Sequence, residues 1–176
     1  MLCRRAHGDV VASLDSDDLW HPSYLEFQRR LIQEHPNAVA YFTGHVTFEG
    51  RCDYEWRSDP LRSATVTRTI QPVPFVKEYN AARGPFYMSW CCVPEAALRR
   101  LGRAPFRLRK CEDVYFLNRA ALLGPIVRAG IPLAAYRIRP GSLSSNRLLL
   151  TESALRAFEV LEQEYGAVCD RRLGTR

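Results

Sequence analysis

The sequence predicts an α/β domain in which a mixed β-sheet is flanked by helices and followed by a C-terminal helix. Short apolar runs of strand length alternate with helical patterns along the first half of the chain. Of the 176 residues, 47% are hydrophobic, which is enough for one core of ordinary size. No apolar run approaches the ~18 residues that a membrane span needs.

The N-terminal elements follow from local signals. DVVASL at 9–14 predicts a short buried strand, in a parallel sheet because its residues do not alternate strictly. Residues 22–35 predict a helix, since apolar side chains recur at helical spacing after Pro22 and Pro36 ends the pattern. The β-branched and aromatic run at 38–50 predicts one strand or two.

The middle of the chain is less regular. Residues 51–85 predict a surface excursion with some strand character, because prolines interrupt an extended pattern. YMSWCCV at 87–93 is a compact apolar segment. Pro94 opens a short helix that Gly102 ends.

The C-terminal part predicts two helices and a strand between them. Residues 112–124 form an amphipathic helix, and Gly130-Ile131-Pro132 turns the chain into the strand LAAYRIR. The final helix spans 148–165 and is expected to place three apolar residues on one face: Leu155, Phe158 and Leu161.

The formal charge is +6, and the cations are 23 arginines and only two lysines. A GC-rich genome explains that bias most simply, and phosphate binding by guanidinium groups is the functional alternative. The densest run, RRLGRAPFRLRK at 99–110, suits a nucleic-acid patch, anionic lipid or a solvated loop. No nucleic-acid motif surrounds it, so we expect no nucleic-acid partner.

The six cysteines include no CxxC pair, so we expect reduced thiols and no structural zinc site. The N-terminus lacks the apolar stretch of a signal peptide. These features predict a cytoplasmic location, including the inner face of a membrane.

Three carboxylates, Asp15, Asp17 and Asp18, follow the first predicted strand directly. Ligands bind at the carboxyl ends of strands in open α/β folds, and alternate residues of an extended segment point the same way. Asp15 and Asp17 can therefore face one site and bind a divalent metal that keeps substrate phosphates as further ligands. The alternative is that these residues form a turn and cap the following helix.

The carboxylates belong to a longer segment, and two further segments of the chain accompany it. LDSDDLWHPSYLEFQRRLIQEHP resembles the segment around the DxD motif of family 2 glycosyltransferases, and CEDVYFLNRAALLG resembles the ED motif of that family. LAAYRIRPGSLSS resembles the strand and loop that follow. The three segments occur in the family's order and cover most of residues 8–146.

The resemblance implies a Rossmann-like GT-A fold and an inverting sugar transfer to an acceptor hydroxyl. Asp17 and Asp15 would hold Mg²⁺ or Mn²⁺ on the diphosphate of a nucleotide-sugar, with UDP as the favoured nucleotide, and Asp18 would be a secondary donor-binding residue. Asp113 would be the general base, with Glu112 as the fallback. On the residues alone, favourable charge in the first turn of a helix is the preferred explanation of this carboxylate pair.

The acceptor side is less well defined by the sequence. The resemblance places Trp90 at the floor of the acceptor site, and a packing role is the alternative. Arg137 and Arg139 could reach the diphosphate or serve only the surface. A saccharide or a lipid-linked acceptor fits, as in polysaccharide biosynthesis, and the arginine run favours peripheral membrane association.

The resemblance also predicts what the chain lacks. Family members carry nucleotide-binding strands upstream of the DxD segment, so we expect residues 1–146 to be the metal and acceptor part of a GT-A domain and 147–176 a helical extension. A sheet without its first strands exposes an edge, which favours self-association. The alternatives are an inactive remnant, a binding module or another metal-dependent nucleotide transferase.

Overall fold

In the computed structural model, residues 7–51, 56, 66–80, 86–102, 111–142 and 147–173 are described. They form a six-stranded mixed sheet of order β1-β5-β3-β6-β2, with β4 paired to β6 beside this path. The strands are β1 (Val10–Ala12), β2 (Leu19–Trp20), β3 (Ala40–Phe48), β4 (Thr67–Ile70), β5 (Cys91–Pro94) and β6 (Ile126–Arg137). The helices are α1 (Tyr24–Glu34), α2 (Pro72–Asn80), α3 (Glu95–Leu101), α4 (Glu112–Leu123) and α5 (Arg147–Leu173), with a 3-10 turn, η3, at Met88–Trp90.

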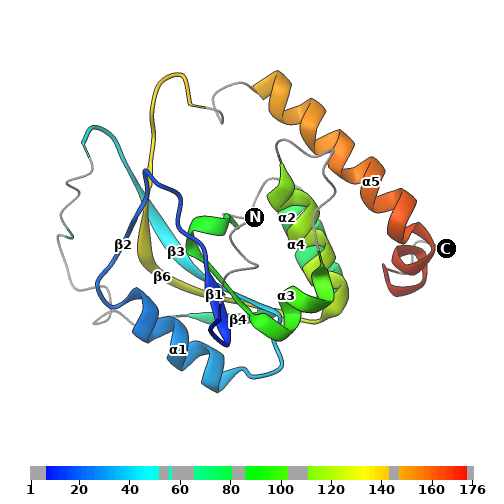
Figure 1. Cartoon of the computed structure of the whole chain (residues 1–176), viewed down its shortest axis with the longest axis horizontal. Coiled ribbons are helices and arrows are strands. Elements are labelled where there is room, and N and C mark those ends of the chain that lie inside the picture. Colours follow the sequence, from blue (N-terminus) through cyan, green and yellow to red (C-terminus); the bar gives the residue numbers. More distant parts are fainter. Residues whose placement is uncertain are drawn as a thin grey trace.

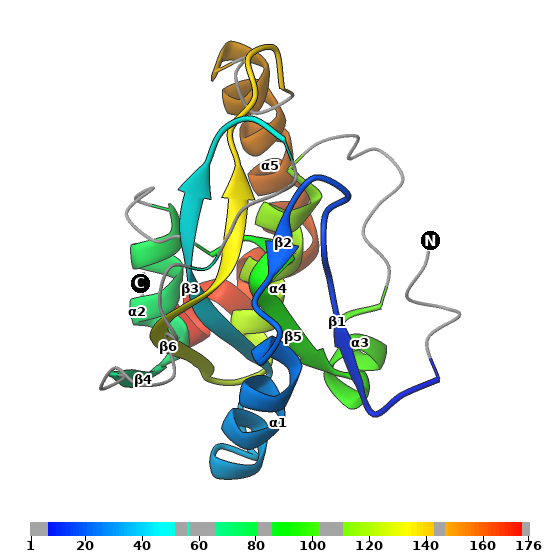
Figure 2. The same ribbon diagram turned by 90° about the vertical axis from the view of Figure 1, so that its left-hand side faces the viewer.

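The helices lie in layers on the two faces of the sheet. Helix α1 covers one face, and α2, α3 and α4 cover the other (Figures 1 and 2). Helix α5 lies outside α4, farthest from the sheet (Figure 1). The predicted α/β class, with a mixed sheet, flanking helices and a C-terminal helix, is therefore confirmed.

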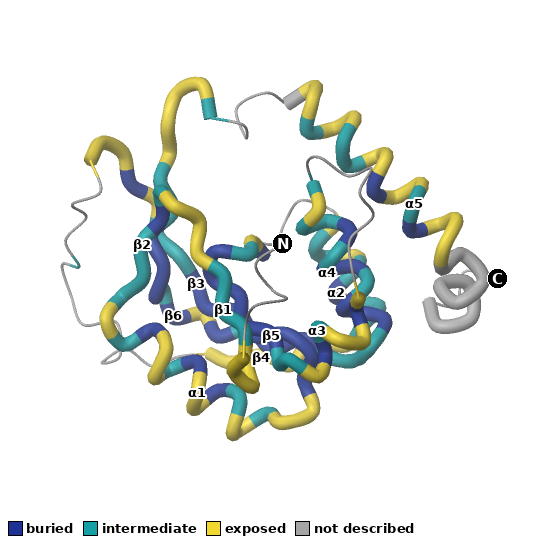
Figure 3. The backbone as a smooth tube through the Cα atoms, viewed as in Figure 1, coloured by how far each residue is buried: buried dark blue, intermediate teal, exposed yellow. Residues whose placement is uncertain are grey.

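Three strands end at the same edge of the sheet. Strands β3 and β6 are parallel, and β1 and β3 are both antiparallel to β5, so β1, β3 and β6 share one direction. Their carboxyl ends carry the loops after Ala12, Phe48 and Arg137. Figure 3 shows exposed backbone at these loops and buried backbone in the middle of β3, β5 and β6. The predicted site residues that follow β1 therefore lie at this edge.

The prediction of β1 as a buried strand in a parallel sheet is wrong. β1 pairs antiparallel with β5, from Val10 opposite Pro94 to Ala12 opposite Cys92, and lies at the margin of the described sheet. Val10 is 36% exposed. A short segment without strict alternation of apolar and polar residues does not by itself distinguish parallel from antiparallel pairing.

Strand β6 continues where the sequence predicted a turn. It runs unbroken through Gly130-Ile131-Pro132, and its pairing with β3 shifts register around Gly44. The shift absorbs Pro132, which has no amide to donate. A Cβ on Gly44 would lie 2.8 Å from the Gly130 carbonyl oxygen, so the close approach of the two strands requires glycine there.

The helices at 22–35, 94–102 and 112–124 are confirmed as α1, α3 and α4, while α2 was missed. Pro72 stands at the first position of α2, where a proline costs no hydrogen bond, so it begins the helix that the sequence analysis assigned to an extended segment. The described part of the arginine run, Arg99–Gly102, ends α3, and residues 103–110 lie outside the described residues.

Helix α5 is longer than predicted and buries a different face. It extends to Leu173, and its buried residues against α4 are Ala157 and Leu161, which pack with Tyr115. Leu155 is 58% exposed, so grouping it with Leu161 on one face was wrong.

Candidate functional site

The DxD loop, residues 13–18, forms a tight turn after β1. The Asp18 amide donates to the Asp15 carbonyl at 3.1 Å, which closes the turn. Within it Asp15 is exposed, Asp17 is partly exposed and Asp18 is buried. The three carboxylates therefore differ in what they offer a ligand: two face solvent and one does not.

Ser89 in η3 anchors this loop from below. Its hydroxyl oxygen accepts the Asp15 amide at 3.1 Å, and its carbonyl accepts Trp20 Nε1 at 2.6 Å. Trp20 also stacks on Tyr24, with ring centroids 4.3 Å apart, so it is a packing residue beneath the loop. Ser89 is buried and connects both the middle of the loop and the strand that follows it, β2, to η3.

Asp18 ties the loop to β6. One carboxylate oxygen accepts the Arg137 amide at 3.0 Å, and only 5% of the residue is exposed. Burial raises its pKa, an effect that the Ser89 side chain and the Arg137 amide partly offset and that Asp15 and Asp17 reinforce. The bond to the Arg137 amide gives Asp18 a structural role at the end of the loop, and its donor-binding role stays a prediction.

Asp17 already faces a cation. Its Oδ2 atom lies 2.5 Å from the guanidinium nitrogen NH2 of Arg139, which follows β6. Both side chains keep exposed surface, at 26% for Asp17 and 52% for Arg139. The structure thus places Arg139 at the DxD loop, while the Arg137 guanidinium donates to the Gly50 carbonyl.

Asp113 stands on the first turn of α4 and faces the same site. Cys111 precedes the helix in a left-handed conformation, with φ of 56°, and leaves Glu112 exposed while Asp113 is partly buried. Burial raises the pKa of Asp113, the Val114 amide partly offsets this, and repulsion from Glu112 and Asp15 adds to it. The charges of Asp113 and Asp15 therefore act on each other although the two residues are distant in sequence.

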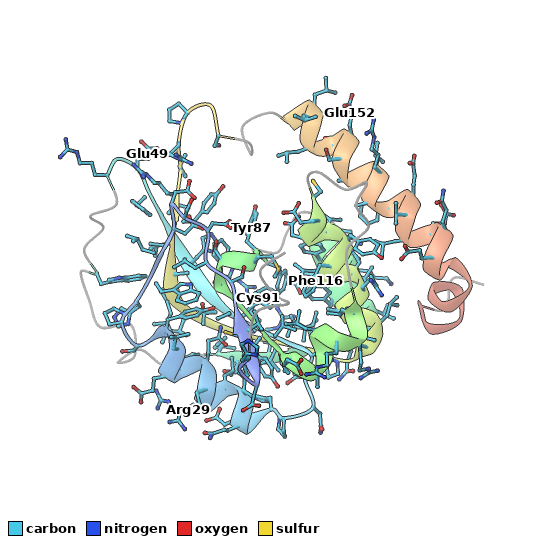
Figure 4. All side chains as sticks on the ribbon, in the orientation of Figure 1. Arg29, Glu49, Tyr87, Cys91, Phe116 and Glu152 are labelled. Carbon is cyan, nitrogen blue, oxygen red and sulfur yellow. The ribbon has the colours of Figure 1, made fainter. Side chains whose placement is uncertain are left out.

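An aromatic cluster forms the floor between these carboxylates. Trp90 has no exposed surface and stacks on His45 with ring centroids 4.2 Å apart. Tyr87 covers it, 5.0 Å from Trp90 and 5.8 Å from Tyr136, and keeps 47% of its surface exposed. Figure 4 shows Tyr87 between the sheet and α4. Any contribution of Trp90 to acceptor binding is therefore indirect, through Tyr87.

The residues of the DxD loop fit a divalent cation that is completed by a ligand. Among the described residues, no group of three or more histidine, cysteine, aspartate or glutamate side chains is arranged to hold a metal ion. Asp15 and Asp17 present carboxylates to solvent, and Asp17 already holds a guanidinium cation. Two carboxylates with substrate phosphates and water are the ligands that Mg²⁺ usually accepts.

Sequence reasoning missed Ser89 and Tyr87. Both lie in YMSWCCV, where the only signal was a compact apolar segment. A serine inside such a segment is a useful indication, because a buried hydroxyl needs a partner. The sequence proposed Arg139 for the diphosphate but gave no sign of its pairing with Asp17.

The comparisons with known proteins give the family and the fold of the chain. The family model described as glycosyl transferase family 2 matches residues 1–100, more than half of the chain, so the protein belongs to that family. No curated protein matches. Within the described residues, no helix combines the length and the apolar character needed to cross a membrane.

Solved structures of TarS from S. aureus share the fold. TarS 1–349 in complex with UDP-GlcNAc is 16% identical and aligns with a TM-score of 0.66 over 92% of this chain and 44% of that one. A second TarS 1–349 structure aligns with a TM-score of 0.56 at 16% identity, over 77% and 37% of the two chains. A longer TarS chain gives 0.56 at 15% identity, over 92% and 28%. The protein has the GT-A architecture and spans less than half the length of these chains.

Proposed function

We propose that this glycosyltransferase transfers a sugar from a nucleotide-sugar donor to an acceptor hydroxyl, with inversion at the anomeric carbon. The observation that carries the proposal is that Asp15, on the loop after β1, lies close enough to Asp113, on the first turn of α4, for its charge to add to the raised pKa of Asp113. A donor held at the loop would thus lie beside a base on α4.

The donor's diphosphate would bind at the DxD loop with Mg²⁺ or Mn²⁺ held by Asp17 and Asp15. The cation would neutralise negative charge that develops on the leaving diphosphate. Ser89 keeps the Asp15 backbone in place, and this positions the carboxylates before the donor arrives. TarS was solved with UDP-GlcNAc, which supports a UDP-sugar as the donor.

Asp113 would accept the proton of the acceptor hydroxyl as the oxygen attacks the anomeric carbon. Attack from the face opposite the leaving diphosphate inverts the configuration of that carbon. Positioned bases contribute ~10² to 10⁴ in rate, and a base is more effective as its pKa approaches the working pH. The raised pKa of Asp113 therefore favours it over Glu112, which is exposed.

The acceptor would lie on Tyr87, with Trp90 as the support beneath that ring. An exposed aromatic face beside a carboxylate suits a sugar. The aromatic ring packs against the C–H groups of the sugar, while the carboxylate receives the proton of a sugar hydroxyl. A saccharide or a lipid-linked saccharide would fit this surface, and the role that we propose for the enzyme is in polysaccharide biosynthesis. Its expected setting is the cytoplasm, with peripheral association at the inner face of the membrane.

The proposal is tested by thermal unfolding of the full chain with Mn²⁺, UDP or both. Binding to the folded state raises the midpoint, by an amount that grows with ligand concentration over the dissociation constant. We expect the rise to be largest with both ligands together and to disappear in Asp17→Ala. The charge-matched control is Asp9→Ala, an exposed carboxylate outside the site, which should keep the rise.

Release of sugar from a UDP-sugar would then separate a transferase from a protein that only binds nucleotide. A wild-type chain that folds but shows no shift with Mn²⁺ and UDP would contradict the proposal and indicate an inactive remnant. An equal shift in Asp17→Ala would move the binding site away from the DxD loop.

A further inference from the structure

Arg139 occupies the side of Asp17 that a divalent cation needs. Its NH2 nitrogen lies 2.5 Å from Asp17 Oδ2, whereas a metal bound to that oxygen would lie at ~2.0–2.1 Å. A guanidinium and a divalent cation also repel each other at such a distance. A metal at this oxygen would therefore compete with Arg139 for Asp17.

Arg139 lies in a turn just beyond the end of β6, and about half of its side chain is exposed. The Ser142 amide donates to the Arg139 carbonyl at 3.2 Å, and Gly141, with φ of 74°, completes the turn. A hollow of about 240 Å³ is lined by Arg139, Pro140, Gly141 and Ser142. The guanidinium thus lies between the DxD loop and an open hollow, with room to change partners.

The local charges explain why a cation is needed before any ligand binds. Asp15, Asp17 and Asp18 lie within one turn, and Asp18 is affected by the charges of both others. Arg139 offsets part of this repulsion at Asp17. Because exposed ion pairs contribute little to stability, the pair is easily exchanged for a better one.

We propose that Arg139 is an exchangeable counter-cation of the donor site. It holds Asp17 in the unloaded enzyme, gives way to the divalent cation, and then binds the donor's diphosphate with its planar fork. A diphosphate carries more negative charge than one carboxylate and offers more oxygens to the guanidinium fork, which makes the second partner stronger than the first. This inference rests on the proposed function and adds a competitor for the metal within the enzyme itself.

The inference predicts opposite effects of one substitution on two ligands. Removing Arg139 removes a competitor for Mn²⁺ and also removes a ligand of the diphosphate. A residue that only maintains the fold would weaken both ligands, and one that only binds phosphate would leave Mn²⁺ unchanged. A gain in Mn²⁺ affinity together with a loss of UDP affinity therefore identifies the exchange.

The experiment uses the full chain and its Arg139→Gln variant. Mn²⁺ alone is titrated and its free fraction followed by electron paramagnetic resonance, and UDP is titrated by calorimetry at a Mn²⁺ concentration that saturates both chains. We expect Mn²⁺ to bind about two- to fivefold more tightly in Arg139→Gln, as the loss of an exposed ion pair implies. UDP should bind about tenfold more weakly, since a charge-assisted contact is lost.

Arg139→Lys keeps the positive charge and should leave Mn²⁺ affinity close to wild type. Arg99→Gln is the matched control, because Arg99 is an exposed arginine that pairs with Glu95 on α3. It removes the same charge away from the site and should change neither affinity. Circular dichroism of each variant checks that it folds.

Two outcomes would overturn the inference, and they differ in whether the metal site of the proposed function is retained. Mn²⁺ affinity that is unchanged or lower in Arg139→Gln, while Asp17→Ala abolishes Mn²⁺ binding, overturns the exchange and keeps the metal site. Mn²⁺ binding that is equal in Asp17→Ala and wild type overturns both the exchange and the metal site of the proposed function.

Discussion

Asp113 combines a raised pKa with a position at the start of α4, and this gives a pH dependence with a defined sign. Burial makes its folded pKa higher than its unfolded one, so the folded state binds the proton more tightly. Stability should then fall as pH rises from the ordinary aspartate range through the folded pKa, and stay level above it. We predict that Asp113→Asn lacks this fall and is more stable than wild type at neutral pH.

Thermal unfolding at a series of pH values tests this prediction. The midpoint should rise by about 2–4 °C for each kcal/mol of unfolding free energy that the variant gains. Glu112→Gln, an exposed neighbour on the same turn, serves as the control. A variant Asp113→Asn that keeps the wild-type pH slope would contradict the assignment of the buried charge to this residue.

Ser89 supports the DxD loop through its hydroxyl, and its loss should be costly. In Ser89→Ala the Asp15 amide loses its acceptor and the buried Asp18 carboxylate loses a polar neighbour. We predict a loss of about 1–3 kcal/mol of unfolding free energy, together with weaker Mn²⁺ and UDP binding. Urea unfolding and the ligand titrations measure the two effects, and Ser153→Ala on α5, where the hydroxyl donates to the Leu149 carbonyl far from the loop, should change neither.

The elements differ in how far the sequence could predict them. Helices α3 and α4 follow from signals within their own segments, such as Pro94 and Gly102 at the two ends of α3. The pairing of β1 with β5 and the continuity of β6 past Pro132 depend on strands elsewhere in the chain, which periodicity does not report. The helix α2 was missed because Pro72 marks an interruption as readily as a helix start.

The site shows the same division between local and distant signals. Asp15, Asp17 and Asp113 stand in short motifs, so the sequence alone proposed them. The roles of Ser89 and Arg139 depend on contacts with residues far away in the sequence, and only the structure brings those residues together.

The contact of α5 with α4 can be tested on two leucines. Leu161 packs with Ala157 and Tyr115, while Leu155 is largely exposed on the same helix. Leu161→Ala should cost about 2–3 kcal/mol in urea unfolding, by loss of buried methylene groups. Leu155→Ala should stay within about 0.5 kcal/mol of wild type. Equal costs would mean that α5 docks in another rotation, or that it contributes no stability.

At the scale of the whole molecule, the margin formed by β1 and α1 stands out. β1 pairs with β5 on one side and lies at the margin of the described sheet, as Figure 2 shows. A groove of about 260 Å³ lies between this strand and α1, lined in part by Val10, Ala12, Leu25 and Ile32. Backbone groups beside an apolar groove favour the addition of a further strand, so we propose that two copies of the chain associate here.

We therefore predict that the mass of the chain in solution, measured by sedimentation equilibrium, rises with concentration and that Leu25→Lys suppresses the rise. Leu25 is 57% exposed on α1 in the single chain, so the substitution should leave the fold intact. If its side chain is buried between two copies, the variant loses that burial and the dissociation constant increases about tenfold or more. Val66→Lys adds the same charge at a residue that is 71% exposed and does not line the groove, and should associate like wild type. Equal suppression by both variants would mean that added charge rather than the groove controls association, and a mass that stays constant with concentration would show that this margin does not join two copies.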